Sequence, residues 1–162
     1  MKIISGGQTG VDRAALDAAL DLGVPCGGYC PRGRKAEDGV IPAKYPLQSL
    51  PSANYRDRTL KNLLKADATL IFYNAKLTGG TRLTADLCRE HRRPFLAIDA
   101  GVHTRQQATE SGFEFMIGNS VRMLNVAGPR KSQWPEGYGY VYEVMQSVLK
   151  LWQSISHEHS CD

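Results

Sequence analysis

The sequence has no apolar run of the roughly 18 to 20 residues that a membrane-spanning helix requires. Its first residues also lack the apolar core of a secretory signal peptide, so we expect a cytoplasmic protein without membrane attachment. There are only four cysteines, scattered over 162 residues. In a chain without a secretion signal, this spacing favours free thiols over a disulfide framework.

Recognisable metal and nucleophile motifs are also missing. Cys26 and Cys30 are separated by three residues, and no second pair follows at zinc-ligand spacing, so we expect no metal site. The sequence has no Gly-x-Ser-x-Gly elbow and no cysteine with an obvious histidine and acid arrangement. Asp12, Asp38 and Asp86 could each act as an acid or base, but no pattern distinguishes one of them. We therefore assign no catalytic residue.

Large charge imbalance and low-complexity segments are absent as well. The chain has 42% hydrophobic and 22% charged residues and a formal net charge of +4, which is typical of a folded domain. We expect one domain over residues 1–155 and a polar tail over residues 156–162. The sequence contains no nucleic-acid reading helix and no aromatic-interleaved basic stripe, so nucleic acid is not an expected partner. A basic rim around an anionic small molecule explains the same charge.

Short apolar runs alternate with amphipathic stretches along the chain. The apolar runs cover residues 2–5, 24–29, 68–73, 95–99 and 123–126, and the helical stretches cover residues 11–22, 54–65, 81–92, 104–118 and 138–155. This order predicts an α/β fold: a Rossmann-like open sheet of about five mainly parallel strands, with helices on both faces. Residues 30–52 contain four prolines and no clear periodicity, which indicates a long functional loop.

Two glycine-rich loops follow strands, where ligands bind in open parallel sheets. The first contains Gly6, Gly7, Gln8, Thr9 and Gly10, and the second contains Thr78, Gly79, Gly80 and Thr81. Each precedes a helix, whose unpaired amides and dipole attract phosphate or another oxyanion. The alternative interpretation is a pair of tight strand-to-helix turns. Neither loop matches the Walker A or GxGxxG pattern.

Further cations and aromatic residues lie near these loops in the predicted topology. Arg32, Gly33, Arg34 and Lys35 belong to the long loop, and Arg130 and Ser132 follow the last strand. We interpret them as a flap and rim that contact an anionic ligand, although an isolated cluster would suit a solvated basic turn. Arg56 and Arg58 begin a helix, where they oppose its dipole unless paired or bound. Trp134, Tyr138 and Tyr140 could stack on a flat ring or belong to the core.

Several long motifs together resemble a known family. These are SGGQTGVDRAALD at residues 5–17, GGYCPRGR at 27–34, AEDG at 36–39, the segment 55–59 and GGT at 79–81. They resemble the family named "putative molybdenum carrier", which includes molybdenum cofactor carrier proteins and lies within the LOG-like Rossmann group. The resemblance implies molybdenum cofactor (molybdopterin) as bound ligand and molybdoenzymes or cofactor-synthesis proteins as partners. It also implies a homo-oligomer, either a dimer or a tetramer.

One departure from the wider group bears on catalysis. LOG-type phosphoribohydrolases carry the pattern PGGxGTxxE, and the position of their glutamate falls on Thr84. A hydroxyl cannot replace a carboxylate as acid, base or cation stabiliser at neutral pH. We therefore expect non-catalytic binding, protection and delivery of molybdenum cofactor or a related phosphorylated pterin. The alternatives are a LOG-like enzyme that acts on a nucleoside monophosphate and a nucleotide-sensing module.

Overall fold

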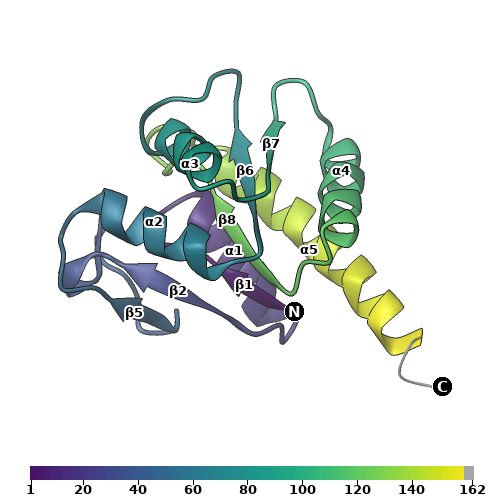
Figure 1. Ribbon diagram of the computed structural model, residues 1–162, viewed down its shortest axis with the longest axis horizontal. Helices are drawn as coiled ribbons and strands as arrows, with labels where there is room; N and C mark the ends of the chain where they lie inside the picture. The colour runs from purple at the N-terminus through teal and green to yellow at the C-terminus, as the bar shows by residue number, and fades with distance from the viewer. Residues whose placement is uncertain (159–162) are drawn as a thin grey trace.

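The computed structural model describes residues 1–158, which form one open sheet with helices on both faces (Figure 1). The sheet consists of β1 (Lys2–Ile4), β2 (Cys26–Cys30), β5 (Leu47–Ser49), β6 (Ala68–Tyr73), β7 (Phe95–Asp99) and β8 (Met123–Ala127). The strand order is β5-β2-β1-β8-β6-β7, and every neighbouring pair is parallel. The predicted fold class is confirmed, with six strands instead of about five.

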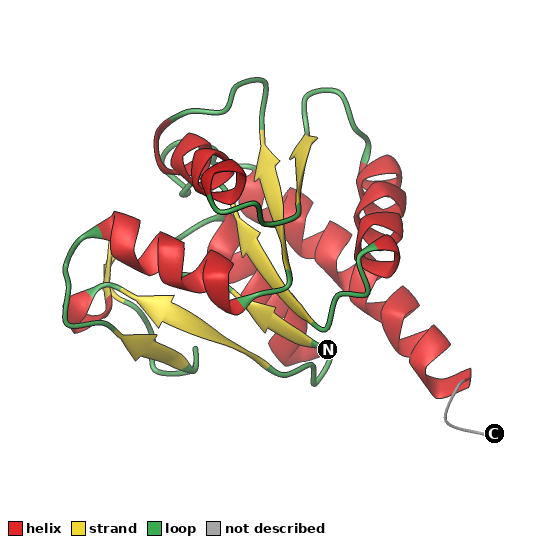
Figure 2. Ribbon diagram, viewed as in Figure 1, coloured by secondary structure: helices red, strands yellow, loops and turns green. Residues whose placement is uncertain are grey.

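Five helices cover the sheet in two layers (Figure 2). They are α1 (Val11–Asp21), α2 (Tyr55–Lys65), α3 (Gly79–Glu90), α4 (Arg105–Gly118) and α5 (Gly137–Glu158). In Figure 1, α2 and α3 lie on the near face, and α1 and α5 lie behind the sheet. Helix α4 packs against α5 and β7 on the far side. Among the described residues, no helix combines the length and apolar character needed to cross a bilayer.

The two faces of the sheet bury cores of different size. The larger core lies against α1, α4 and α5 and includes Ile3, Phe72 and Met145. The smaller core joins α2 to α3 through Leu63 and Leu87. Strand β6 is buried along almost its whole length, as expected for a central parallel strand covered on both faces. The thinner packing between α2 and α3 leaves room for the cavity described below.

The long loop contains more regular structure than the sequence indicates. It includes the short helix η1 (Arg32–Arg34), the antiparallel strands β3 (Lys35–Ala36) and β4 (Gly39–Val40), and β5. Strand β5 joins the main sheet because Gly28, Tyr29 and Cys30 pair with its three residues. Strands of two or three residues are too short to show periodicity, which explains why they were not predicted.

The predicted boundaries are confirmed closely for most other elements. Helix α4 begins with a capping box, in which Thr104 Oγ1 accepts from Gln107 N and Gln107 Oε1 accepts from Thr104 N. Helix α5 extends to Glu158, three residues beyond the predicted end at position 155. The remainder of the predicted polar tail, residues 159–162, lies outside the described residues.

Candidate ligand-binding site

A cavity of about 420 Å³ lies at the carboxyl ends of β1 and β8, between α2 and α3. The chain leaves β1 toward β2 on one side, and β6 leads to β7 on the other side. Connections therefore diverge at this point, which is where open α/β sheets bind ligands. The volume is within the range of about 300 to 1,000 Å³ that small-molecule sites occupy.

Buried polar side chains concentrate in this cavity. Of the ten polar or charged side chains that are buried in the described part of the chain, six line it: Gln8, Asp12, Asn62, Thr81, Thr84 and Asn125. Five of the six form hydrogen bonds within the chain, which offset the cost of burying a polar group. Their concentration gives the cavity a polar lining.

The amino terminus of α3 forms one wall of the cavity. The preceding residue, Thr78, has extended backbone and its side chain makes no capping hydrogen bond. Gly80 and Thr81 line the cavity, and a Cβ on Gly80 would meet no atom within 4 Å. The first-turn amides of a helix have no intrahelical partner, and the helix dipole favours negative charge there. This terminus therefore has room for an anion, and anion binding by the second glycine loop stays a prediction.

The amino terminus of α1 is closed, in contrast to that of α3. The Asp12 carboxylate accepts from Gln8 N, and the Gln8 side-chain oxygen accepts from Thr9 N. Val11 N donates to Pro129 O at 3.3 Å. A Cβ on Gly10 would lie 2.7 Å from the same Pro129 oxygen, so the glycine is required by close approach of residues 129–131. Gly10 is therefore covered, whereas Gly6 and Gln8 line the cavity, and anion binding by this loop stays a prediction.

Only part of the first predicted loop therefore faces the cavity. Gly6 and Gln8 line it, whereas Gly7, Thr9 and Gly10 do not. Gly7 has a φ of 77° and packs beneath the Leu47 side chain. Thr9 Oγ1 accepts from Lys131 N and donates to the Glu37 carboxylate. Sequence alone could not separate these positions, because the partners that cover them are distant in the chain.

The predicted basic flap does not close over the cavity. The Arg34 guanidinium donates to the carbonyl oxygens of Ile41, Pro42, Tyr45 and Leu47 at 2.9 to 3.1 Å. It therefore organises its own loop. Arg32 and Lys35 are exposed, and with Gly33 they lie outside the cavity lining. None of these four positions lines the cavity, and their contact with a ligand stays a prediction.

Two acidic residues at the tip of the β3–β4 hairpin interact with polar groups nearby, including Ser132, which we predicted to contact the ligand. Ser132 Oγ donates to the Glu37 carboxylate at 2.6 Å, and Ser132 N donates to it at 3.1 Å. These hydrogen bonds and that from Thr9 hold the pKa of Glu37 below its ordinary value. Beside it, Asp38 forms a bidentate ion pair with Arg13. The hairpin is thus fastened to the start of α1, and Ser132 faces Glu37 instead of the cavity.

Three arginines from separate segments line the cavity: Arg56, Arg58 and Arg130. Arg56 and Arg130 are half-exposed and contact Glu90 and Glu37 only at 3.6 and 3.7 Å. Such pairs contribute little, so both guanidinium groups can turn to a bound anion. The sequence identified Arg130 directly, and it identified Arg56 and Arg58 only as cations that oppose the dipole of α2.

Arg58 is held differently from the other two arginines. Its Nη1 lies 3.1 Å from Asp12 Oδ2, and its side chain is only 15% exposed. The guanidinium passes directly over Gly6, where a Cβ would lie 1.4 Å from Nη1. Burial raises the pKa of Asp12 even though Arg58 opposes that shift. Asp12 is the single carboxylate in the lining of this cavity.

The three aromatic residues that could have stacked on a ligand or belonged to the core lie outside the cavity lining. Trp134 and Tyr140 are buried in the larger core, and the Tyr138 hydroxyl donates to Asp17 at 2.7 Å. Tyr55, the first residue of α2, is the aromatic residue that lines the cavity. The sequence signal for it was its position beside Arg56 and Arg58, in a segment of the family motif.

Metal ligation has no structural basis in residues 1–158. No group of three or more histidine, cysteine or acidic side chains is placed to hold an ion there. Cys26, Cys30 and Cys88 are free thiols, and Cys161 lies outside the described residues. The polar chemistry of the cavity therefore comes from amides, hydroxyls, arginines and Asp12.

Comparison with known proteins identifies the family. A model of the circularly permutated YpsA SLOG family matches residues 3–149. The chain belongs to this family. It is also similar to a crystal structure named "Putative molybdenum carrier protein" from Syntrophus aciditrophicus SB, with 40% identity and a TM-score of 0.90. The match covers 91% of this chain and 94% of the other. Among curated proteins, the comparison finds no match.

Family membership confirms the resemblance seen in the sequence and gives Thr84 a structural setting. Thr84 is buried and lines the cavity on α3, and its hydroxyl donates to Gly80 O at 2.9 Å. The position where LOG-type enzymes carry a glutamate therefore faces the ligand space in this SLOG protein, but it offers a hydroxyl already directed to its own helix. Asp12 is the carboxylate that the lining offers for acid or base chemistry.

Proposed function

We propose that this protein binds a phosphorylated small molecule of the molybdenum cofactor type, protects it and delivers it without catalysing a reaction. The observation that carries the proposal is the uncapped amino terminus of α3 inside a cavity lined by polar side chains. Its free amides suit a terminal phosphate. Arg56 and Arg130, which are weakly held, suit further anionic oxygens of the same ligand.

Other properties support a carrier over an enzyme. A molybdopterin-type ligand has a phosphate at one end and an oxygen-rich metal centre at the other, so an arginine-lined polar cavity complements both. Enclosure between α2 and α3 would shield an oxidation-prone dithiolene. Thr84 stands at the position where a LOG-type hydrolase carries its glutamate, and its hydroxyl donates to Gly80 O. The carrier name of the 40% identical protein agrees with this proposal. Delivery would require a molybdoenzyme or a cofactor-synthesis protein as partner.

The decisive experiment is native mass spectrometry of protein purified anaerobically from a cofactor-producing host. We expect a bound mass that matches a molybdopterin species. Gly80→Asp should abolish this mass, because its carboxylate would occupy the open amides of α3 in space that is otherwise empty. Gly139→Asp is the matched control: it makes the same substitution in the first turn of α5, where a Cβ also meets nothing within 4 Å.

Two outcomes would contradict the carrier proposal. The first is protein that emerges without any phosphorylated pterin from a host that makes the cofactor in excess. The second is equal ligand occupancy in Gly80→Asp and in the wild type, which would show that the amino terminus of α3 does not contact the ligand. A bound nucleotide mass would redirect the proposal to the nucleotide alternatives.

One observation favours an enzymatic alternative, a hydrolase that releases the base from a nucleoside monophosphate. Asp12 is a buried cavity carboxyl, and burial raises its pKa, as is common for catalytic acids. Its contacts with Arg58 and Gln8 N argue for a structural role. We expect no base release from nucleoside monophosphates. Robust turnover that is lost in Asp12→Asn, with the fold retained, would establish the alternative.

A further inference from the structure

Tyr55 is an exposed aromatic residue on the wall of a polar cavity. It begins α2, its side chain lines the cavity, and the residue is 42% exposed. Its hydroxyl has no hydrogen-bond partner within residues 1–158, in contrast to the hydroxyls of Tyr45, Tyr138 and Tyr142. Packing of the folded chain therefore does not explain a tyrosine at this position.

The setting of Tyr55 fixes one side of the ring and leaves contact area for a ligand. The Arg58 guanidinium carbon lies 5.7 Å from the ring centroid, within the range of a cation–π contact. Because Asp12 holds Arg58 over Gly6, this contact restrains the ring. A restrained, half-exposed aromatic ring offers stacking area at a small cost in conformational entropy.

The opposite wall of the cavity comes from α3, which lies beside α2 on the same face of the sheet (Figure 1). Leu83 lines the cavity from that helix, and Val126 and Ala127 contribute apolar area from β8. The open amides at Gly80 and Thr81 belong to α3, whereas Tyr55 belongs to α2. A ligand that contacts both groups must therefore cross the cavity from one helix to the other.

We propose that Tyr55 stacks on a flat heteroaromatic ring of the ligand while the ligand's phosphate lies against the amino terminus of α3. The inference rests on the proposed function and deepens it, because it assigns the residue that contacts the ring of the ligand. The ligand is a phosphorylated heteroaromatic compound. A sugar phosphate or a free inorganic oxyanion would leave Tyr55 and Leu83 without contact and would fill only part of about 420 Å³.

The test compares two phosphorylated probes by isothermal titration calorimetry. GMP carries a flat ring with the 2-amino-4-oxo pattern that pterins share, and ribose 5-phosphate carries the same sugar phosphate without the ring. We expect the wild type to bind GMP at least about tenfold more tightly than ribose 5-phosphate, the scale that aromatic stacking on a base supplies. Tyr55→Ala should abolish this preference and leave the affinity for ribose 5-phosphate unchanged. Tyr55→Phe should retain it, because the ring remains.

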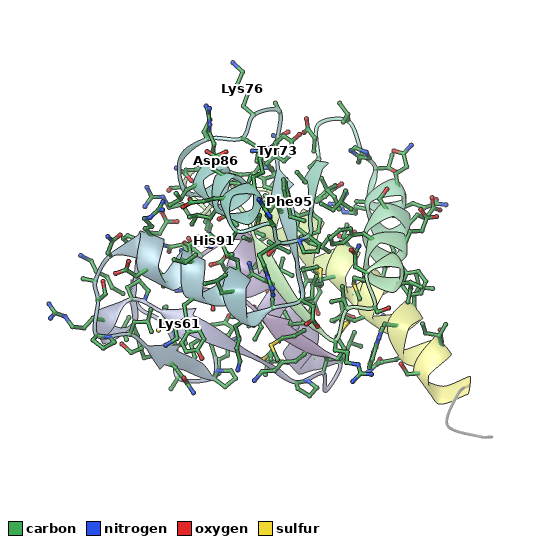
Figure 3. The ribbon with its side chains drawn as sticks, in the orientation of Figure 1. Lys61, Tyr73, Lys76, Asp86, His91 and Phe95 are labelled. Carbon is green, nitrogen blue, oxygen red and sulfur yellow. The ribbon has the colours of Figure 1, made fainter. Side chains whose placement is uncertain are left out.

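Tyr73→Ala is the matched control. Tyr73, labelled in Figure 3, is partly exposed at the end of β6. It lies outside the cavity lining. We expect it to keep the wild-type preference. Equal loss of both probes in Tyr55→Ala, or no change in either, would overturn the ring assignment while the phosphate site stands. Absence of binding of both probes to the wild type would overturn this inference, whereas the proposed carrier function would be decided by the mass of the bound ligand.

Discussion

Replacing Gly6 with alanine should disrupt the cavity without deleting any charged group. A Cβ at this position would lie 1.4 Å from Arg58 Nη1 and 2.6 Å from Arg58 Cζ. The backbone of Gly6 is not in the left-handed region, so alanine is compatible with its conformation. The guanidinium must therefore leave its position over Gly6, and the 3.1 Å contact with Asp12 is lost.

The expected cost follows from the burial of Asp12. Removing one partner of a buried ion pair typically costs about 3–5 kcal/mol. We expect the lower end, about 3 kcal/mol, because the displaced Arg58 can reach solvent through the cavity and Asp12 can take up a proton. For a domain of this size, that corresponds to a decrease in Tm of about 6–12 °C.

A double-mutant cycle measured by urea denaturation tests the cause. In an Arg58→Ala background the guanidinium is absent, and the next nearest atom to the new methyl group is Asp12 Oδ2 at 3.0 Å. There the substitution should cost less than about 1 kcal/mol, which gives a coupling energy of about 2 kcal/mol. Gly139→Ala is the control for the substitution itself, because a Cβ there meets nothing and alanine favours the helix.

The pH dependence provides a second check. Burial raises the pKa of Asp12 above 3.8, so the folded state binds a proton more tightly than the unfolded state, and ionisation lowers stability as pH rises through this window. Without Arg58 nearby, the pKa should rise further. The difference between the variant and the wild type should thus be smaller in mildly acidic than in alkaline buffer. Additive costs in the cycle, or a difference that grows on acidification, would refute the reasoning.

Three other predictions concern the loops around the cavity. Arg34→Ala should expose the loop to limited proteolysis, because four carbonyl oxygens lose their shared donor; unchanged cleavage would contradict this role. Gly80→Asp should stabilise the ligand-free protein by about 0.3–1 kcal/mol through the helix dipole, which a small rise in Tm would show. A decrease in Tm would show that the terminus is not open. The hairpin contact of Glu37 should weaken as pH falls below 4.5, because its lowered pKa means that protonation costs the folded state stability. After correction for intrinsic rates, hydrogen exchange of the hairpin amides should accelerate on acidification in the wild type but not in Glu37→Gln.

The fold could be predicted mainly because its elements carry local signals. The continuous apolar run of β6 and the capping box at Thr104 are both recorded in neighbouring residues, and both are found in the structure. Strand β5 carries no such signal. Its three residues form a strand because β2 offers a free edge, and that edge is a property of the folded sheet.

The candidate site could be predicted only in part, for a related physical reason. Glycine loops after strands indicate the edge of the sheet at which the cavity lies, and Gly6, Gln8, Gly80, Thr81 and Arg130 line that cavity. Whether a donor is free depends on groups far along the chain. From the sequence, Arg34 could be expected to contact an anion, but in the fold its guanidinium donates to four carbonyl oxygens of its own loop.

The two glycine loops differ in local structure because the chain supplies carboxylates to only one of them. At the start of α1, Asp12 accepts from Gln8 N, and Glu37 accepts from Thr9 and Ser132. The positive groups there are already matched by internal carboxylates. At the start of α3 no carboxylate plays that part, and the side chain of Thr78 does not cap the helix. Under the proposed function, a phosphate would gain most at α3, where it would satisfy open amides without displacing an internal ion pair.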